Sequence, residues 1–148
     1  MILRVATTVE LDALTLYRLL RLRTDVFVVE QRCPYPELDG RDLEPLTRHL
    51  WFASDGIGGE PLSYLRLLTD PDGCARIGRV CTATHARGTG LSGRLVAAAL
   101  DLIGARTCVL DAQSYLVGFY KQFGFTESGP EYVEDDIPHV PMVREYRD

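Results

Sequence analysis

Residues 79–111, RVCTATHARGTGLSGRLVAAALDLIGARTCVLD, decide the fold. The first four of these residues are rich in β-formers, and residues 85–90 contain the glycines of a turn. From there on, apolar side chains recur at helical spacing: Leu91, Leu95, Ala98 and Leu102. Gly104 lies where helices commonly end in the left-handed conformation, and residues 107–110 are again rich in β-formers. The stretch therefore predicts a strand, a turn, a helix and a second strand.

The turn itself, residues 87–92, is called the glycine turn below, and it has the features of a phosphate-binding site. Gly88 and Gly90 precede the first turn of the predicted helix, where four backbone N–H groups lack partners and the helix dipole is positive. Glycine has no Cβ, so a ligand can approach the backbone closely. Arg87 adds a fixed positive charge. The alternative interpretation is an ordinary turn that uses glycine for its positive φ.

The same glycines also match a dinucleotide-binding fingerprint. Gly88-x-Gly90-x-x-Gly93 is a G-x-G-x-x-G sequence, and Asp111 follows near the spacing of a ribose-binding acid. In dinucleotide folds, however, the first glycine follows the strand directly, whereas residues 83–87 intervene here. The unit also begins past the middle of the chain, which leaves few residues for further parallel strands. A nicotinamide-dependent oxidoreductase is therefore the less favoured interpretation.

Two motifs in this order resemble the GNAT superfamily of acyl-CoA N-acyltransferases. Arg87, Gly90 and Ser92 occupy the positions of its pyrophosphate loop, R-x-x-G-x-G/A, with serine in place of the usual small residue. Residues 119–125, FYKQFGF, are similar to its tyrosine-to-Gly-Phe signature. Segments across nearly the whole chain resemble the ElaA-like branch of the superfamily: VFVVEQ at 26–31, CPY at 33–35, LDG at 38–40 and IPH at 137–139.

The resemblance implies one GNAT-like N-acetyltransferase domain over residues 1–148. Its fold would be an α/β fold, with a mixed, mostly antiparallel sheet and helices on both faces. The strand before the glycine turn and the strand after its helix would splay apart, and the pantetheine arm of acetyl-CoA would lie between them. Acetyl-CoA would be the acyl donor, and the acceptor would be an amine of a small molecule or a protein. An acyl-CoA-binding sensor or partner module with little turnover is the alternative.

The resemblance also assigns binding residues. The residues expected to contact acetyl-CoA are Val80, Cys81 and Thr82 for the pantetheine arm, Arg87, Gly88, Thr89, Gly90, Leu91 and Ser92 for the pyrophosphate, and Gln113 and Ser114. The residues expected to line the acceptor pocket are Glu30, Tyr35, Asp39 and His139.

Acyl transfer from a thioester to an amine needs a base for the ammonium proton and an acid for the departing thiolate. Tyr120 matches the tyrosine of the superfamily and is the expected acid, with a packed aromatic as the alternative. Many members of the superfamily carry a carboxylate that acts as the general base on the strand before the glycine turn, but residues 76–80 contain no carboxylate. Glu30, Asp111 and His139 stay open as bases. An imidazole, which titrates near ~6.5 in model compounds, is the best suited of these groups.

Composition limits the function classes. The chain has 148 residues, 46% of them hydrophobic, which is enough for one domain with a sizeable core. The net charge is −5 and no block of Lys and Arg occurs, so we expect no nucleic-acid partner and favour a basic substrate such as an amine. With no apolar span of ~20 residues and no apolar leader, we expect no membrane partner and a cytoplasmic protein.

The cysteines and histidines predict no metal site. Four cysteines occur without a C-x-x-C pair, and Cys81 and Cys108 lie in apolar strands, as small core residues do. The three histidines lack ligand spacing.

The rest of the chain predicts further strands over residues 2–6, 49–53, 62–68, 74–82, 125–127 and 142–146. Helices are expected over residues 11–27, opened by a Thr7–Glu10 capping box, and over residues 114–122. Residues 30–42 and 131–141 are expected as loops. Along the first helix, apolar side chains should face the core and arginines the solvent: Leu16, Leu19, Leu20 and Phe27 toward the core, and Arg18, Arg21 and Arg23 toward solvent.

Overall fold

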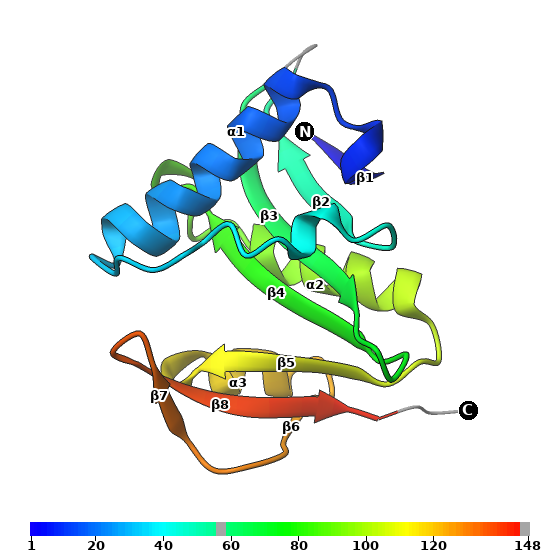
Figure 1. The fold of residues 1–148 in the computed structure, drawn as a ribbon, viewed down its shortest axis with the longest axis vertical. Coiled ribbons are helices and arrows are strands. Elements are labelled where there is room, and N and C mark those ends of the chain that lie inside the picture. The colour runs from blue at the N-terminus through cyan, green and yellow to red at the C-terminus, as the bar shows by residue number, and fades with distance from the viewer. Residues whose placement is uncertain (56–58, 146–148) are drawn as a thin grey trace.

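The computed structural model describes residues 1–55 and 59–145, and their strands form one mixed sheet (Figure 1). The strand order is β1-β2-β3-β4-β5-β8-β6, with β7 paired to β8. The bounds are β1 (Ile2–Thr7), β2 (Arg48–Ala53), β3 (Pro61–Thr69), β4 (Ala75–Thr82), β5 (Cys108–Gln113), β6 (Thr126–Glu127), β7 (Tyr132–Glu134) and β8 (Ile137–Arg144). The predicted hairpin of β2 and β3 is present, although residues 56–58 of its turn lie outside the described residues.

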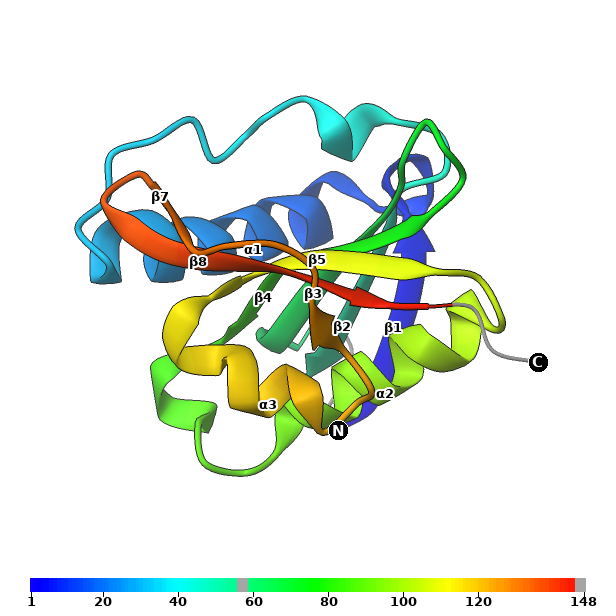
Figure 2. The ribbon, with the colours of Figure 1, turned by 90° about the horizontal axis from the view of Figure 1, so that it is seen from below.

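Helices cover both faces of the sheet (Figure 2). Helix α1 (Ala13–Thr24) lies on one face, and α2 (Leu91–Ile103) and α3 (Val117–Lys121) lie on the other. Short 3₁₀ turns are formed by Thr8–Glu10, Arg41–Leu43, Thr84–Ala86 and Ser114–Leu116. The larger core cluster joins the sheet to α2, for example through Leu65 and Leu95, and a smaller cluster lies under α1. This is the predicted mixed, mostly antiparallel fold.

The first helix begins later and ends differently than predicted. The backbone N–H and the hydroxyl of Thr7 do donate to Glu10, but this capping box closes only the 3₁₀ turn. Helix α1 starts at Ala13, where the carboxylate of Asp12 accepts a hydrogen bond from the N–H of Thr15. It continues as a π-helical turn, Asp25–Glu30, a geometry that is frequent at functional sites.

One prediction about the faces of α1 is wrong. Leu19 is buried as expected and Arg21 is exposed, but Arg23 has no exposed surface. Its guanidinium pairs with Glu37 and Asp42 from the following loop. A buried charge is tolerated when it is paired and hydrogen-bonded, and here the partners come from 14 and 19 residues away.

The C-terminal region also differs from the prediction, because residues 131–141 form a hairpin rather than a loop. Strands β7 and β8 pair around Asp135 and Asp136, whose φ values of 51° and 62° fit a tight hairpin turn. Strand β8 is thus longer than predicted and runs beside β5 along its length.

The predicted helix over 114–122 is a 3₁₀ turn followed by the short α3. Gly104 ends α2 with positive φ but with ψ at −131°, outside the left-handed helical region.

The predicted splay is present between β4 and β5. Their parallel pairing consists of Ala75 with Cys108 and Arg76 with Val109 within the part of the chain that the structure describes. Beyond these pairs the two strands diverge toward the left of Figure 1. Among the residues that the structure describes, the β5-facing backbone edge of β4 therefore has no strand partner over most of its length.

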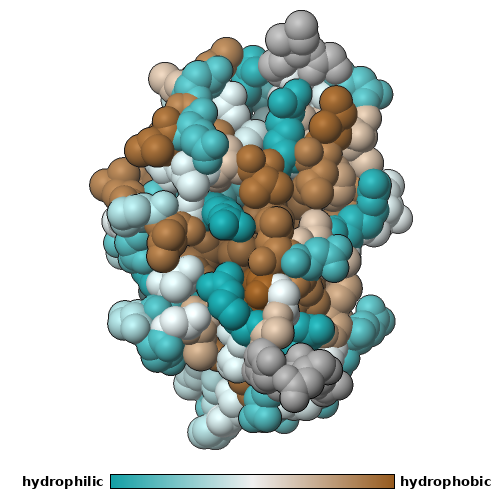
Figure 3. Space-filling view, turned by 90° about the vertical axis from the view of Figure 1, so that its right-hand side faces the viewer, coloured by the Kyte–Doolittle hydropathy of each residue, from teal (hydrophilic) through white to brown (hydrophobic). Residues whose placement is uncertain are grey.

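Strand β1 forms one edge of the sheet and exposes apolar side chains, among them Ile2 and Val5. Figure 3 shows hydrophobic surface on this side of the molecule, which lies at the right in Figure 1. Among the described residues, no helix has the length and apolar character needed to cross a membrane.

Candidate active site

A cleft of about 1240 Å³ fills the space between the diverging strands. Its walls come from the π-helical turn after α1, the loop that follows it, β3, β4, the glycine turn, β5, α3 and β8. Most of the predicted site residues line it: Glu30, Tyr35, Asp39, Val80, Cys81, Thr82, Arg87, Gly88, Gly90, Leu91, Ser92, Gln113, Tyr120 and His139. Thr89 and Ser114 lie beside the lining, with their hydroxyls donating to the Ala86 carbonyl and to Glu131.

The glycine turn has the conformation that its residues predict. Gly88 and Gly90 both have φ of 80°, and Gly90 is the N-cap of α2. A Cβ on either glycine would meet no atom within 4 Å, so both face open space. The hydroxyl of Ser92 shares a 2.7 Å hydrogen bond with that of Thr82 at the end of β4. This bond gives the serine a polar partner where the family pattern has glycine or alanine.

Arg87 and Glu30, which the sequence assigns to different roles, form an ion pair. Both terminal nitrogens of Arg87 donate to the Glu30 carboxylate at 2.7 Å, and its Nε donates to the Thr82 carbonyl. The hydrogen bond from Arg87 lowers the pKa of Glu30. A carboxylate with a lowered pKa is a weaker proton acceptor, which argues against Glu30 as the base.

Tyr120 lies on the α3 side of the cleft and is only 5% exposed. Its ring packs edge-on against Phe119 and Phe125. Burial raises the pKa of the phenol, so the hydroxyl keeps its proton at neutral pH and can act as a donor.

His139 lies on β8 opposite Gln113 of β5. Its Nδ1 is 2.8 Å from the carbonyl oxygen of Ile137, which can only accept, so Nδ1 carries the hydrogen. The neutral ring therefore has its free lone pair on Nε2. The ring stacks on Tyr132 at a centroid distance of 5.7 Å, which fixes its plane. Asp111, the third candidate base, is engaged in a 2.8 Å ion pair with Arg76.

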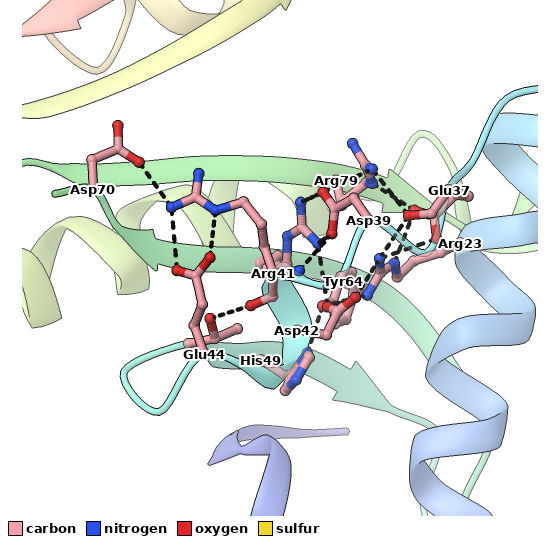
Figure 4. A network of polar contacts seen from close by, with 12 residues as sticks. Arg23, Glu37, Asp39, Arg41, Asp42, Glu44, His49, Tyr64, Asp70 and Arg79 are labelled. Atoms are coloured by element: carbon pink, nitrogen blue, oxygen red, sulfur yellow. Dashed lines mark hydrogen bonds and ion pairs between the residues drawn. The ribbon is translucent and has the colours of Figure 1, made fainter.

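Asp39, predicted for the acceptor pocket, belongs to a polar network (Figure 4). Tyr35, predicted for the same pocket, contacts Arg79 of this network. The carboxylate of Asp39 accepts two hydrogen bonds from Arg66 at 2.9 and 2.8 Å. Although burial raises the pKa of Asp39, these bonds outweigh it and lower the pKa to about 2. The ring of Tyr35 lies under the guanidinium of Arg79. Burial raises the pKa of the Tyr35 phenol to about 12.

Sequence reasoning missed the other members of this network. Arg23, Glu37, Asp42, His49 and Tyr64 are all buried, and they join α1, the loop after it and the strands β2 and β3. Their pairing depends on contacts between distant segments. The one local signal is the density of acidic residues in ELDGRD, residues 37–42.

The diverging strands, the glycine turn at the head of α2 and the buried tyrosine together define the acyl-CoA N-acyltransferase class. A sequence profile of the acetyltransferase (GNAT) domain matches residues 37–146. The chain belongs to the GNAT acetyltransferase family, whose members use acyl-CoA donors.

Within this family the chain belongs to the ElaA-like branch. It is 39% identical to the protein ElaA of Escherichia coli K12 over 148 residues, covering 92% of this chain and 91% of that protein. The crystal structure of E. coli ElaA superposes with a TM-score of 0.88 at 35% identity, covering 97% of this chain and 99% of that one.

Two further proteins are similar over most of their length. The UPF0039 protein Rv2851c of Mycobacterium tuberculosis is 53% identical over 138 residues, covering 91% of this chain and 87% of that protein. The crystal structure of an acyl-CoA N-acyltransferase from Pseudomonas aeruginosa has a TM-score of 0.86 at 42% identity, covering 97% of this chain and 99% of that one.

Proposed function

We propose that the chain is an acetyl-CoA-dependent N-acetyltransferase, with residues 1–148 as one catalytic domain. The observation that carries this proposal is the position of the cleft. It lies along the unpaired edge of β4, begins at the glycine turn and passes Tyr120. A thioester bound along this cleft would have its pyrophosphate at the turn and its sulfur near the phenol.

The backbone supplies the binding groups for the donor. Polar groups of residues 80–82 on the open edge of β4 would pair with the pantetheine amides. The first-turn N–H groups of α2 and the guanidinium of Arg87 would hold the pyrophosphate. The pyrophosphate would then compete with Glu30 for Arg87, because the two anions need the same donors.

The acyl transfer would proceed by direct attack in a ternary complex. The amine nitrogen, after losing a proton to Nε2 of His139 directly or through water, forms a bond to the acetyl carbon. The tetrahedral intermediate then collapses, the carbon–sulfur bond breaks, and the phenol of Tyr120 gives its proton to the thiolate. The second proton of the attacking nitrogen passes, directly or through water, to the phenolate of Tyr120 and restores the phenol. The products are an N-acetylated amine and free CoA. The acceptor is an amine of a small molecule or a protein, and the cytoplasmic location stays a prediction of the sequence.

The test is a screen of amines for release of the CoA thiol from acetyl-CoA. We expect at least one amine class to give turnover that depends on both substrates and to yield an acetylated product of matching mass. Calorimetric titration of acetyl-CoA and CoA runs in parallel. Tight CoA binding with no turnover across the library would favour the sensor alternative, and no CoA binding would contradict both.

A further inference from the structure

Strand β4 contains a bulge whose central residue is Arg79. In the antiparallel pairing with β3, Tyr64 faces Cys81 whereas Arg66 faces Gly78, so two residues of β4 stand opposite one of β3. Arg79 has φ of 53°, in the left-handed region that residues with a Cβ rarely adopt. A conformation of this kind persists only where the surroundings determine it. At this position the contacts that hold the backbone conformation are made by the side chain of Arg79.

The guanidinium of Arg79 is held from three sides. Its Nε donates to the Glu37 carboxylate at 2.5 Å, and an Nη donates to the Glu37 carbonyl at 3.0 Å. The same Nη lies 3.4 Å from Asp39, and the ring of Tyr35 covers the guanidinium at 5.5 Å. All three of these residues belong to the loop after α1, so the loop and the bulge are fixed to each other.

Glu37 is itself anchored to helix α1. Its side chain is 4% exposed, and both of its carboxylate oxygens lie 3.0 Å from nitrogens of Arg23. Arg23 is completely buried, also pairs with Asp42 at 2.7 Å and lies against the ring of Tyr64. Figure 4 shows this chain of ion pairs running from Arg23 through Glu37 to Arg79. Because burial makes unpaired charges costly, these ion pairs hold the three side chains in one geometry.

The bulge lies a few residues beyond the last β4–β5 pair, Arg76 with Val109, in the part of β4 that lines the cleft. We propose that Arg79 and Glu37 are positioning residues for acyl transfer: through the ion pairs with Arg23 they fix the backbone of residues 79–81 against which the thioester lies. They act through that backbone and touch no reacting atom. This inference rests on the proposed function, since it assigns a role within that reaction.

The experiment measures kcat and KM for the best amine from the screen, and the Kd of acetyl-CoA, in four variants. Arg79→Gly removes the side chain while glycine keeps φ of 53° accessible. Arg79→Lys keeps the charge but loses the planar fork of donors. Glu37→Gln removes the buried charge, and Glu37→Gln with Arg79→Gly completes a double-mutant cycle. Arg21→Ala is the matched control, because it removes an exposed arginine of α1.

We expect kcat of Arg79→Gly to fall ten- to a hundredfold, since small displacements of a reacting group have effects of that size. KM for the amine and the Kd of acetyl-CoA should stay within threefold, and Arg79→Lys should be intermediate. The double variant should lose no more than the worse single variant, because both act through one contact. Arg21→Ala should match wild type. Rates are expressed per folded enzyme, with the folded fraction measured by circular dichroism.

Three results would overturn this inference and leave the proposed function intact. These are a kcat of Arg79→Gly within threefold of wild type, a loss confined to the KM of the amine, or fully additive losses in the double variant. If Glu37→Gln fails to fold, Arg79→Lys and Arg79→Gly decide the question. Absence of turnover by the wild-type protein with every amine would overturn the proposed function, and this inference with it.

Discussion

In the proposed reaction, Tyr120 is the residue on which the chemical step would depend most directly. The Tyr120→Phe variant keeps the ring that packs against Phe119 and Phe125 and removes only the hydroxyl. General acid catalysis is typically worth ~10²–10⁴-fold, so kcat should fall by that order while the Kd of acetyl-CoA stays near wild type. Because burial raises the pKa of this phenol, the wild-type rate should not decline through its ionisation up to about pH 10. A kcat within threefold of wild type would make Tyr120 a packing residue.

The ion pair of Arg87 with Glu30 predicts opposite effects for its two partners. Arg87→Glu should weaken acetyl-CoA binding at least tenfold, about 1.4 kcal/mol, because it places a negative charge beside the pyrophosphate. Glu30→Gln should strengthen binding up to about fivefold, since exposed ion pairs are worth roughly 0–1 kcal/mol and the competing anion is gone. Calorimetric titration measures both. A large loss of kcat in Glu30→Gln would instead restore Glu30 as the base.

His49 predicts a pH dependence of stability. It is completely buried, and burial lowers its pKa to about 4, whereas a histidine in the unfolded chain has a pKa of ~6.5. Between these values the unfolded state binds more protons, so stability is full above pH 6.5 and falls as the pH drops toward 4. Between pH 7 and 5.5 this group should cost about 1 kcal/mol of unfolding free energy, measured by urea titration. His49→Gln should lose that part of the slope, and an unchanged slope would assign it to other groups.

Single residues also show what the sequence could not reveal. The glycine turn was predictable because its donors, its charge and its positive φ angles come from adjacent residues. The partner of Arg87 was not, because Glu30 lies 57 residues away. Arg23 was predicted on the solvent side of α1 because an isolated helix gives no sign of the acids that a later loop brings over it.

At the scale of elements, the start of α2 depends on glycine. Gly90→Ala should lower the unfolding free energy by ~1–2 kcal/mol, because a Cβ is strained at φ of 80° even though it meets no atom. It should also weaken acetyl-CoA binding, since that Cβ would occupy the open side of the turn. Gly118→Ala is the control: its φ is not positive and its site is equally open, so stability should stay equal or rise. Equal effects of the two substitutions would contradict the argument.

The elements that the sequence predicted well are those with strong local periodicity, such as α2 and the strands β2 to β5. The hairpin of β7 and β8 was missed because Pro138 and Pro141 lack the N–H groups that strands use, which is typical of loops. Strand β8 forms nonetheless, since β5 offers it a partner along six residue pairs. Its aspartate turn was hidden in the acidic run of residues 131–136.

At the scale of the whole molecule, ligand binding should be visible as thermal stabilisation. Acetyl-CoA at a hundred times its Kd should add ~2.7 kcal/mol to the unfolding free energy. For a chain of 148 residues this corresponds to a rise in Tm of roughly 5–10 °C. Arg87→Glu at the same concentration should rise less, and NADH should cause no shift. Stabilisation by NADH and not by CoA would revive the dinucleotide interpretation.

The junction of two residue pairs between β4 and β5 bears on how long the protein survives in a cell. Proteases cleave molecules that have unfolded locally. Because so few residue pairs join β4 and β5 within the described residues, we expect these two strands to separate first. A bound acyl-CoA would supply the backbone partners that β5 withholds and keep the opened population small. Degradation would then slow when the donor is plentiful and accelerate when it is scarce. The amount of protein would follow the supply of its own co-substrate without any change in transcription, and a pulse-chase comparison of wild type with Arg87→Glu would measure this.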